Sequence, residues 1–156
     1  MGGNSIEKSF MMTASHEAAA SEGLAFVDTN VFVYAQDSSN PDKRTRALDL
    51  IKSLSSEGRI VISTQVLQEY ANVAVRKLGL LLPQTNALID ELAKLPVCPI
   101  DSLIIKDAVA LFFTHKLSFF DSLIIATAAR NNCAYLYSED MADGQTINGV
   151  TIVNPF

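Results

Sequence analysis

Two carboxylates come shortly after apolar runs that are typical of buried strands. Asp28 directly follows the run 24–27, and Asp140 lies just past a second run, 133–137. In α/β proteins, ligands bind at the carboxyl ends of the parallel strands. We therefore expect both acids at the functional edge of a sheet. The alternatives are structural: Asp28 would cap a helix that begins near Val31, and Asp140 would belong to a surface turn.

Two further acids lie on predicted helices whose neighbouring residues are apolar. Glu69 is three residues after Val66 and four before Val73, so it points toward the apolar stripe or its margin. Asp121 opens a helix that is apolar nearly all round and therefore buried. The alternatives are again structural: Glu69 would reach water from the edge of the stripe, and Ser118 with Asp121 would form a capping box.

One shared site would explain why four acids occupy strand ends and apolar helices. Carboxylates suit hard divalent cations such as Mg²⁺ and Mn²⁺. Such a cation activates water and neutralises charge on a phosphodiester during hydrolysis. No other catalytic motif competes, because His115 stands alone near a predicted helix end, and Gly144 and Gly149 form no phosphate-binding loop.

Strand-like and helix-like segments alternate along the chain. This alternation indicates an α/β fold with a mainly parallel sheet. We also expect turns at Asp143–Gly144 and Asn148–Gly149. The expected strands are 24–27, 59–63, 97–100, 133–137 and 150–153, and the expected helices after the first strand are 43–55, 65–78, 83–95, 103–115 and 119–130.

The composition is that of one globular domain. The chain has 156 residues, 49% of them hydrophobic, and no apolar run reaches the length of about 18 residues that spans a bilayer. Residues 1–22 are small and polar, so we expect a loosely structured head with a short helix around 16–20, followed by a domain over 23–156. Cys98 and Cys133 lack metal-ligand spacing and are interpreted as reduced core thiols, which favours a cytoplasmic protein; the alternative is a disulfide between them.

The net charge of −5 has the wrong sign for a typical nucleic-acid-binding surface. The objection weakens if the acids converge and metal neutralises them. The densest basic group, Lys43, Arg44 and Arg46, is a candidate RNA-binding surface; the alternative is a solvated helix face. The apolar segment 78–82 connects two helices and is interpreted either as an interface or as part of the core.

Four segments of this sequence resemble the PIN domain, and within it the VapC-like toxin ribonucleases of bacterial toxin–antitoxin pairs. The similarity runs from about Leu24 to Phe156, with the motifs in the family's order. Asp-Thr-Asn after a strand is only moderately specific alone, whereas all four segments in order are highly specific. These segments are 26–34, 63–69, 117–124 and 137–141.

The resemblance implies a three-layer PIN-like fold, with a mainly parallel central sheet flanked by helices. It also implies an Mg²⁺- or Mn²⁺-dependent endoribonuclease that hydrolyses RNA, an antitoxin partner and a homodimer. By matching motifs, the metal-binding catalytic acids would be Asp28, Glu69, Asp121 and, as a fourth acid that varies within the family, Asp140. The same motifs imply that Thr29 or Asn30, together with Ser138, give polar support to the carboxylates.

Other functions remain open at this point. A PIN-fold nuclease could act in RNA processing without an antitoxin, or a PIN-like module could bind a partner without catalysis; the four intact acids count against the second. A phospho-receiver domain needs a late lysine, and no lysine follows Lys116. A dehalogenase-type phosphatase needs a second aspartate two residues after Asp28, where this chain has Asn30.

Overall fold

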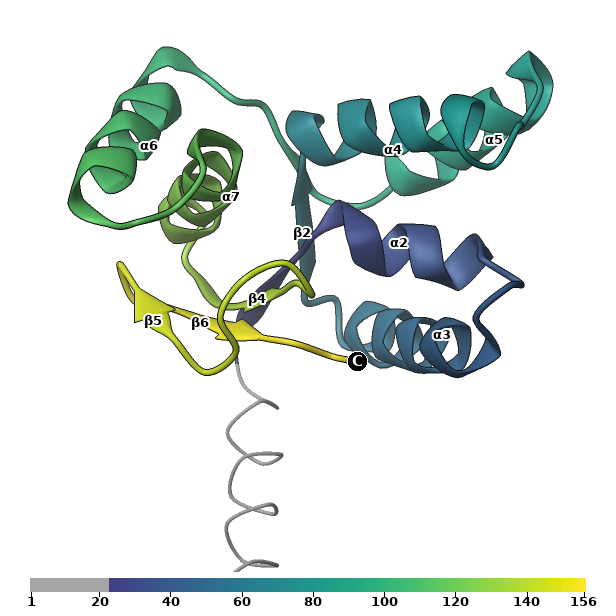
Figure 1. Ribbon diagram of the computed structural model, residues 1–156, viewed down its shortest axis with the longest axis horizontal. Helices are drawn as coiled ribbons and strands as arrows, with labels where there is room; N and C mark the ends of the chain where they lie inside the picture. The colour runs from purple at the N-terminus through teal and green to yellow at the C-terminus, as the bar shows by residue number, and fades with distance from the viewer. Residues whose placement is uncertain (1–22) are drawn as a thin grey trace, which may run out of the picture.

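Six strands form one sheet in the computed structural model, which describes residues 23–156 (Figure 1). The strand order is β3-β2-β1-β4-β6-β5, and every neighbouring pair is parallel except β5 and β6. The predicted head over 1–22, with its short helix, lies outside the described residues. The strands are β1 (Leu24–Val27), β2 (Ile60–Ser63), β3 (Val97–Cys98), β4 (Cys133–Tyr137), β5 (Thr146–Ile147) and β6 (Val150–Val153).

Helices cover both faces of this sheet and make the fold three-layered. Figure 1 shows α6 and α7 packed together on one side, with α2, α3, α4 and α5 on the other. This arrangement confirms the predicted α/β fold with a mainly parallel central sheet. The helices are α2 (Thr29–Gln36), α3 (Pro41–Ser56), α4 (Thr64–Arg76), α5 (Leu82–Leu92), α6 (Ser102–Thr114) and α7 (Phe119–Arg130).

The central strands are buried on both faces, which explains their continuous apolar sequences. Phe26, Ile62 and Leu136 are fully buried although they belong to three different strands. A parallel sheet covered by helices on both faces gives each strand residue an apolar neighbour whichever way its side chain points. The same burial fixes the ends of β1 and β4, from which functional side chains emerge.

The structure differs from the sequence predictions mainly in short elements. β5 is not predicted by the sequence, because a two-residue strand carries no periodicity. It pairs with β6 across the predicted turn, in which Asn148 and Gly149 both have positive φ, as a tight hairpin requires. The predicted strand over 97–100 shortens to Val97–Cys98.

The two cysteines are free thiols, as the sequence predicts. Burial raises the pKa of the Cys133 thiol to about 12, so this thiol stays protonated at neutral pH and packs as a small apolar side chain. Among residues 23–156, no helix has the length and apolar character needed to cross a membrane.

Candidate active site

Asp28 and Ser138 meet because β1 and β4 are parallel neighbours that end in register. Val27 pairs with Tyr137, and the backbone N–H of Asp28 donates to the Tyr137 carbonyl over 3.0 Å. The next residue on each strand is therefore placed at the same point of the sheet edge. The Ser138 hydroxyl donates to Asp28 Oδ2 over 2.7 Å, and both side chains are buried. The sequence-predicted position of Asp28 at this edge is confirmed.

Asp28 is also the N-cap of α2. Its Oδ1 accepts the backbone N–H of Thr29 over 2.7 Å. The structural alternative from the sequence is therefore also correct, and the helix begins at Thr29 rather than near Val31. Capping and clustering are compatible, because the cap uses Oδ1 whereas Ser138 binds Oδ2.

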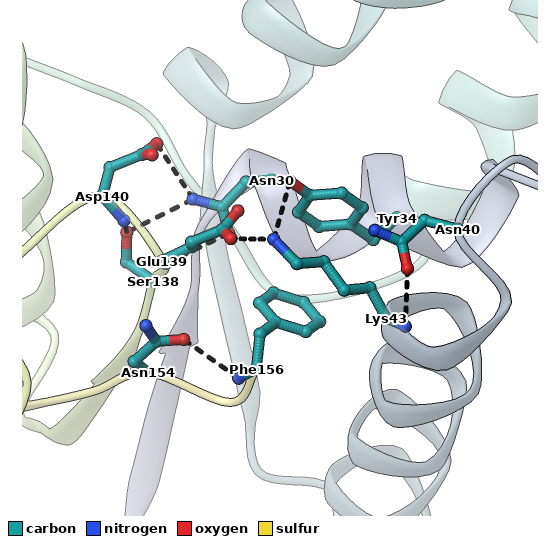
Figure 2. A network of polar contacts seen from close by, with 9 residues as sticks. All are labelled: Asn30, Tyr34, Asn40, Lys43, Ser138, Glu139, Asp140, Asn154 and Phe156. Atoms are coloured by element: carbon teal, nitrogen blue, oxygen red, sulfur yellow. Dashed lines mark hydrogen bonds and ion pairs between the residues drawn. The ribbon is translucent and has the colours of Figure 1, made fainter.

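Asn30 links Asp28 to Asp140. Its side-chain Nδ2 lies 3.3 Å from Asp28 Oδ2, 3.1 Å from Asp140 Oδ2 and 3.3 Å from Ser138 Oγ. Figure 2 shows this amide group directed at Ser138 and Asp140. The backbone N–H of Asp140 also donates to Ser138 Oγ over 3.2 Å. Asp140 is exposed, so the two acids lie at the wall and at the rim of one site.

Glu69 reaches the same site from α4. This helix begins directly after β2, the neighbour of β1 on the side away from β4. The Thr29 hydroxyl donates to Glu69 Oε2 over 2.9 Å, and Gln65 Nε2 donates to Glu69 Oε1 over 2.8 Å. Glu69 is half-buried, as expected for an acid at the margin of an apolar stripe.

Asp121 lies in the first turn of α7 and is half-buried. Its backbone N–H donates to Ser118 Oγ over 3.1 Å, which confirms Ser118 as the helix cap. Within residues 23–156, no hydrogen bond joins the Asp121 carboxylate to the other three acids. The connection runs through Gln65, whose Nε2 lies 3.5 Å from the carbonyl oxygen of the preceding residue, Phe120. The structure thus joins Asp28, Glu69 and Asp140 through shared polar neighbours, whereas the Asp121 carboxylate makes no hydrogen bond with this group in the described residues.

Burial raises the pKa of Asp28 from 3.8 to about 6. The hydrogen bonds from Ser138 and Thr29 lower this pKa, whereas the charges of Glu69 and Asp140 raise it. The repulsion from two other carboxylates reflects their closeness to Asp28.

The comparisons with known proteins agree with this geometry. A family model described as the PIN domain matches residues 25–142, which is most of the chain. The chain belongs to the PIN-domain family. Its central sheet and helices are those expected for a PIN domain, and a comparison with curated proteins found no match.

Solved structures with this PIN fold include bacterial toxins. A toxin–antitoxin complex from Klebsiella pneumoniae is 25% identical, with a TM-score of 0.66, over 85% of this chain and 98% of that one. VapC20 from Mycobacterium tuberculosis, a toxin that cleaves the sarcin–ricin loop, is 18% identical, with a TM-score of 0.59, over 74% and 89% of the two chains. VapBC2 from Rickettsia felis, bound to a DNA fragment from its promoter, is 18% identical, with a TM-score of 0.57, over 83% of this chain and 96% of that one.

The donor set of this PIN domain fits a hard divalent cation in its chemistry. Among the described residues, the hydrogen bonds to the carboxylates of Asp28, Glu69 and Asp140 all come from neutral groups, and no lysine or arginine donates directly to them. In the described part of the chain, no three His, Cys, Asp or Glu side chains are close enough to hold an ion as placed. The Asn30 amide contacts both Asp28 Oδ2 and Asp140 Oδ2, so it holds these two carboxylates near each other.

The three candidate RNA-binding cations of the PIN domain have different environments. Lys43 pairs with Glu139, next to Asp140, and so lies by the acids. Arg44 instead donates from Nε to the Ala35 carbonyl near the end of α2, over 3.3 Å. Arg46 is exposed and makes no side-chain hydrogen bond or ion pair within the described residues. The structure therefore places Lys43, but neither arginine, beside the candidate site.

A cleft of about 670 Å³ adjoins the acids of the PIN domain and runs between α2 and α4. Sequence reasoning missed two of the residues that shape the site, Gln65 and Tyr34. Gln65 lies one helical turn before Glu69. Residues with this i,i+4 spacing are neighbours on a helix surface, so the hydrogen bond between Gln65 and Glu69 could have been predicted from the sequence. The cleft is lined by Thr29, Asn30, Val33, Tyr34, Asp37, Ser39, Glu69, Asn72, Val73, Lys77, Leu78, Glu139 and Asp140.

We expect a pH-dependent stability difference between the wild-type PIN domain and Asp28→Asn in EDTA. Because the folded-state pKa of Asp28 is about 6 and its ordinary value is 3.8, the folded state retains a proton that the unfolded state releases. The stability of the wild type relative to the variant should therefore fall as pH rises from about 4 to about 6.5. At about 1.4 kcal/mol per pH unit, the total fall is about 3 kcal/mol. Urea unfolding across this range measures it, and a constant difference between the two proteins would contradict it.

Proposed function

We propose that this chain is a metal-dependent ribonuclease that hydrolyses RNA phosphodiesters and acts as the toxin of a toxin–antitoxin pair. The observation that carries the proposal is the convergence of Asp28, Glu69 and Asp140 from three separate elements, held only by neutral donors. Such a concentration of unbalanced negative charge is costly for folding. A cluster of this kind is expected where a cation binds during function.

Asp28, Glu69, Asp121 and Asp140 would hold Mg²⁺ or Mn²⁺. When bound, the ion supplies a Lewis acid that lowers the pKa of a water molecule and stabilises charge on phosphate oxygens. Two features of the donor set support this choice of ion. The proposed ligands are carboxylate oxygens, which these hard cations prefer, and within the described residues neither cysteine nor His115 lines the cleft beside the acids.

The neighbouring polar residues would hold these acids in fixed orientations, so that water can attack the phosphate in line with the bond that breaks. Ser138 fixes Asp28 Oδ2, so the buried carboxylate keeps one orientation. Thr29 and Gln65 fix the two oxygens of Glu69. Asn30 would restrain Asp140, which is otherwise exposed at the rim. One of the ordered carboxylates would accept the proton of the attacking water.

Exposed apolar side chains support a protein partner. Leu81 is 69% exposed and Leu82 73% exposed, so these two leucines do not complete the core. A second group comes from α6 and the start of α7, where Phe113 is 81% exposed and Phe120 63% exposed. Apolar patches of this kind mark interfaces, which fits both an antitoxin and a homodimer. The structural neighbour from Klebsiella pneumoniae is a toxin–antitoxin complex, and we extend that role to this chain.

An antitoxin for this site would present a basic side chain to the acids and an apolar helix to a groove. The toxin would act in the cytoplasm, where the RNA is, and the free thiols of Cys98 and Cys133 suit that reducing compartment.

A growth experiment tests the toxin proposal. We expect that bacteria expressing the wild type alone slow or stop growing, because active ribonuclease degrades their RNA. Bacteria that express Asp28→Asn, or the wild type together with the gene adjacent to its own, should grow normally. Normal growth at high levels of soluble wild-type protein would overturn the toxin role. If the purified protein still cleaved RNA, the function would then be that of an RNA-processing nuclease without an antitoxin.

A further inference from the structure

Lys43 is held in one position by residues from three separate segments. It projects from α3, and its ammonium group pairs with the Glu139 carboxylate and lies 3.2 Å from the Tyr34 hydroxyl. The ammonium also lies 4.5 Å from the centre of the Tyr34 ring and 5.4 Å from that of Phe156. Figure 2 shows the lysine side chain extending between these two rings toward Glu139.

This arrangement is continuous with the acidic site. The backbone N–H of Glu139 lies 3.5 Å from Asn30 Oδ1, while the amide nitrogen of the same asparagine binds Asp140. Tyr34, Glu139 and Asp140 line the same cleft. Lys43 therefore contacts two residues of the cleft wall, one of which is the chain neighbour of Asp140 (Figure 2).

A role in stability alone explains this arrangement poorly. Exposed ion pairs stabilise folded proteins little, and ordering a lysine side chain costs conformational entropy. The Lys94–Glu91 pair is an ordinary example, with side chains 69% and 68% exposed. The side chains of Lys43 and Glu139 are 28% and 25% exposed, and two aromatic rings restrain the lysine as well.

We propose that Lys43 binds an RNA phosphate next to the scissile one, and that Glu139 holds its ammonium in place until this phosphate replaces the carboxylate. The inference rests on the proposed ribonuclease function. A phosphate entering the cleft meets strong repulsion from the acids, so one cation fixed beside them sets where the RNA backbone lies. The rings of Tyr34 and Phe156 position Lys43 and keep the ammonium over the cleft edge when Glu139 is released. Lys77 also lines the cleft, but no hydrogen bond or ion pair within the described residues fixes its ammonium.

The test is RNA binding by four variants made in the Asp28→Asn protein, so that the RNA stays intact. These are Lys43→Gln, Lys43→Arg, Glu139→Gln and, as a matched control that removes one charge from the same helix, Arg46→Gln. The probe is a short fluorescein-labelled single-stranded RNA of mixed sequence, with Mg²⁺ kept constant. Anisotropy gives the binding constant between about 50 and about 200 mM NaCl.

We expect Lys43→Gln to weaken binding about three- to tenfold relative to Arg46→Gln, and to reduce the slope of log K against log salt by about 0.7. Lys43→Arg should keep most of the affinity and most of the salt slope, because it retains the positive charge. Glu139→Gln should tighten binding, because it removes the carboxylate that competes for Lys43. A purely structural role for Lys43 would leave the salt slope unchanged.

Three results would overturn the inference. The first is RNA binding in which Lys43→Gln matches Arg46→Gln in affinity and salt slope, which rejects the role of Lys43 and leaves the ribonuclease proposal intact. The second is weaker binding by Glu139→Gln, which rejects the exchange of carboxylate for phosphate. The third is absence of RNA binding by every protein, including the parent, which rejects the ribonuclease proposal together with this one.

Discussion

Replacement of Asp28 by asparagine is expected to lower the rate of RNA cleavage by about a hundredfold or more. Removing a residue that only supports a metal ligand already costs about ten- to a hundredfold in metal affinity or activity. Asp28 is only 4% exposed and forms hydrogen bonds with Ser138 and Thr29, which fix both of its carboxylate oxygens in the site wall. Asparagine has nearly the same shape as aspartate, and its amide oxygen can still accept the hydrogen bond from the Thr29 backbone N–H. The fold should therefore be retained.

A matched control for this variant is Asp49→Asn. Asp49 is exposed on α3, and its side chain makes no hydrogen bond or ion pair within the described residues. The control therefore makes the same chemical change and the same change in net charge away from the site. Cleavage is measured on one RNA pool with equal concentrations of the three proteins. Equal rates for wild type and Asp28→Asn would reject Asp28 as a catalytic acid.

Asp121→Asn is expected to cause a loss of similar size, although no hydrogen bond within residues 23–156 joins its carboxylate to the other acids. The prediction follows from the position of Asp121 in the first turn of α7, next to the carbonyl that Gln65 contacts. A divalent cation would draw this carboxylate toward Glu69, because it binds several oxygens at once. The change removes one charge and leaves the helix cap intact, so the fold should be retained.

Ser118→Ala separates the structural and catalytic roles of this helix end. It removes the cap hydroxyl but leaves the Asp121 carboxylate, so it should cost about 1 kcal/mol of stability. We expect Ser118→Ala to melt earlier and keep its cleavage rate, whereas Asp121→Asn keeps its melting temperature and loses cleavage. The opposite pattern would mean that Asp121 serves only the helix.

The parts of the site that depend on strand ends could be predicted from the sequence. Asp28 and Asp140 follow runs whose apolar character is set by burial on both faces, so these runs locate the sheet edge. The inward position of Glu69 follows from helical periodicity. The fold is predictable for the same reason, because strand and helix periods are local properties of the chain.

Contacts that depend on side chains from distant segments were not predictable. Lys43 and Glu139 are 96 positions apart, and nothing in either local sequence signals their pairing. The exposed face of α6 escapes prediction for a related reason. Helical spacing groups Phe112 with the buried residues Ile104, Ala108 and Leu111, yet Phe112 is 43% exposed, because a helix that is apolar nearly all round has no unique core face.

If the four acids form one metal-dependent ribonuclease site, as we propose, RNA cleavage by the purified protein must depend on a divalent metal. Purified wild-type protein is incubated with an RNA pool in Mg²⁺, in Mn²⁺, in excess EDTA, and in EDTA followed by excess Mg²⁺. We predict cleavage with either metal, no cleavage in EDTA, recovery when Mg²⁺ is restored, and little or no cleavage by Asp28→Asn in any condition. Full cleavage by the wild type in EDTA, or none in any metal, would contradict the claim.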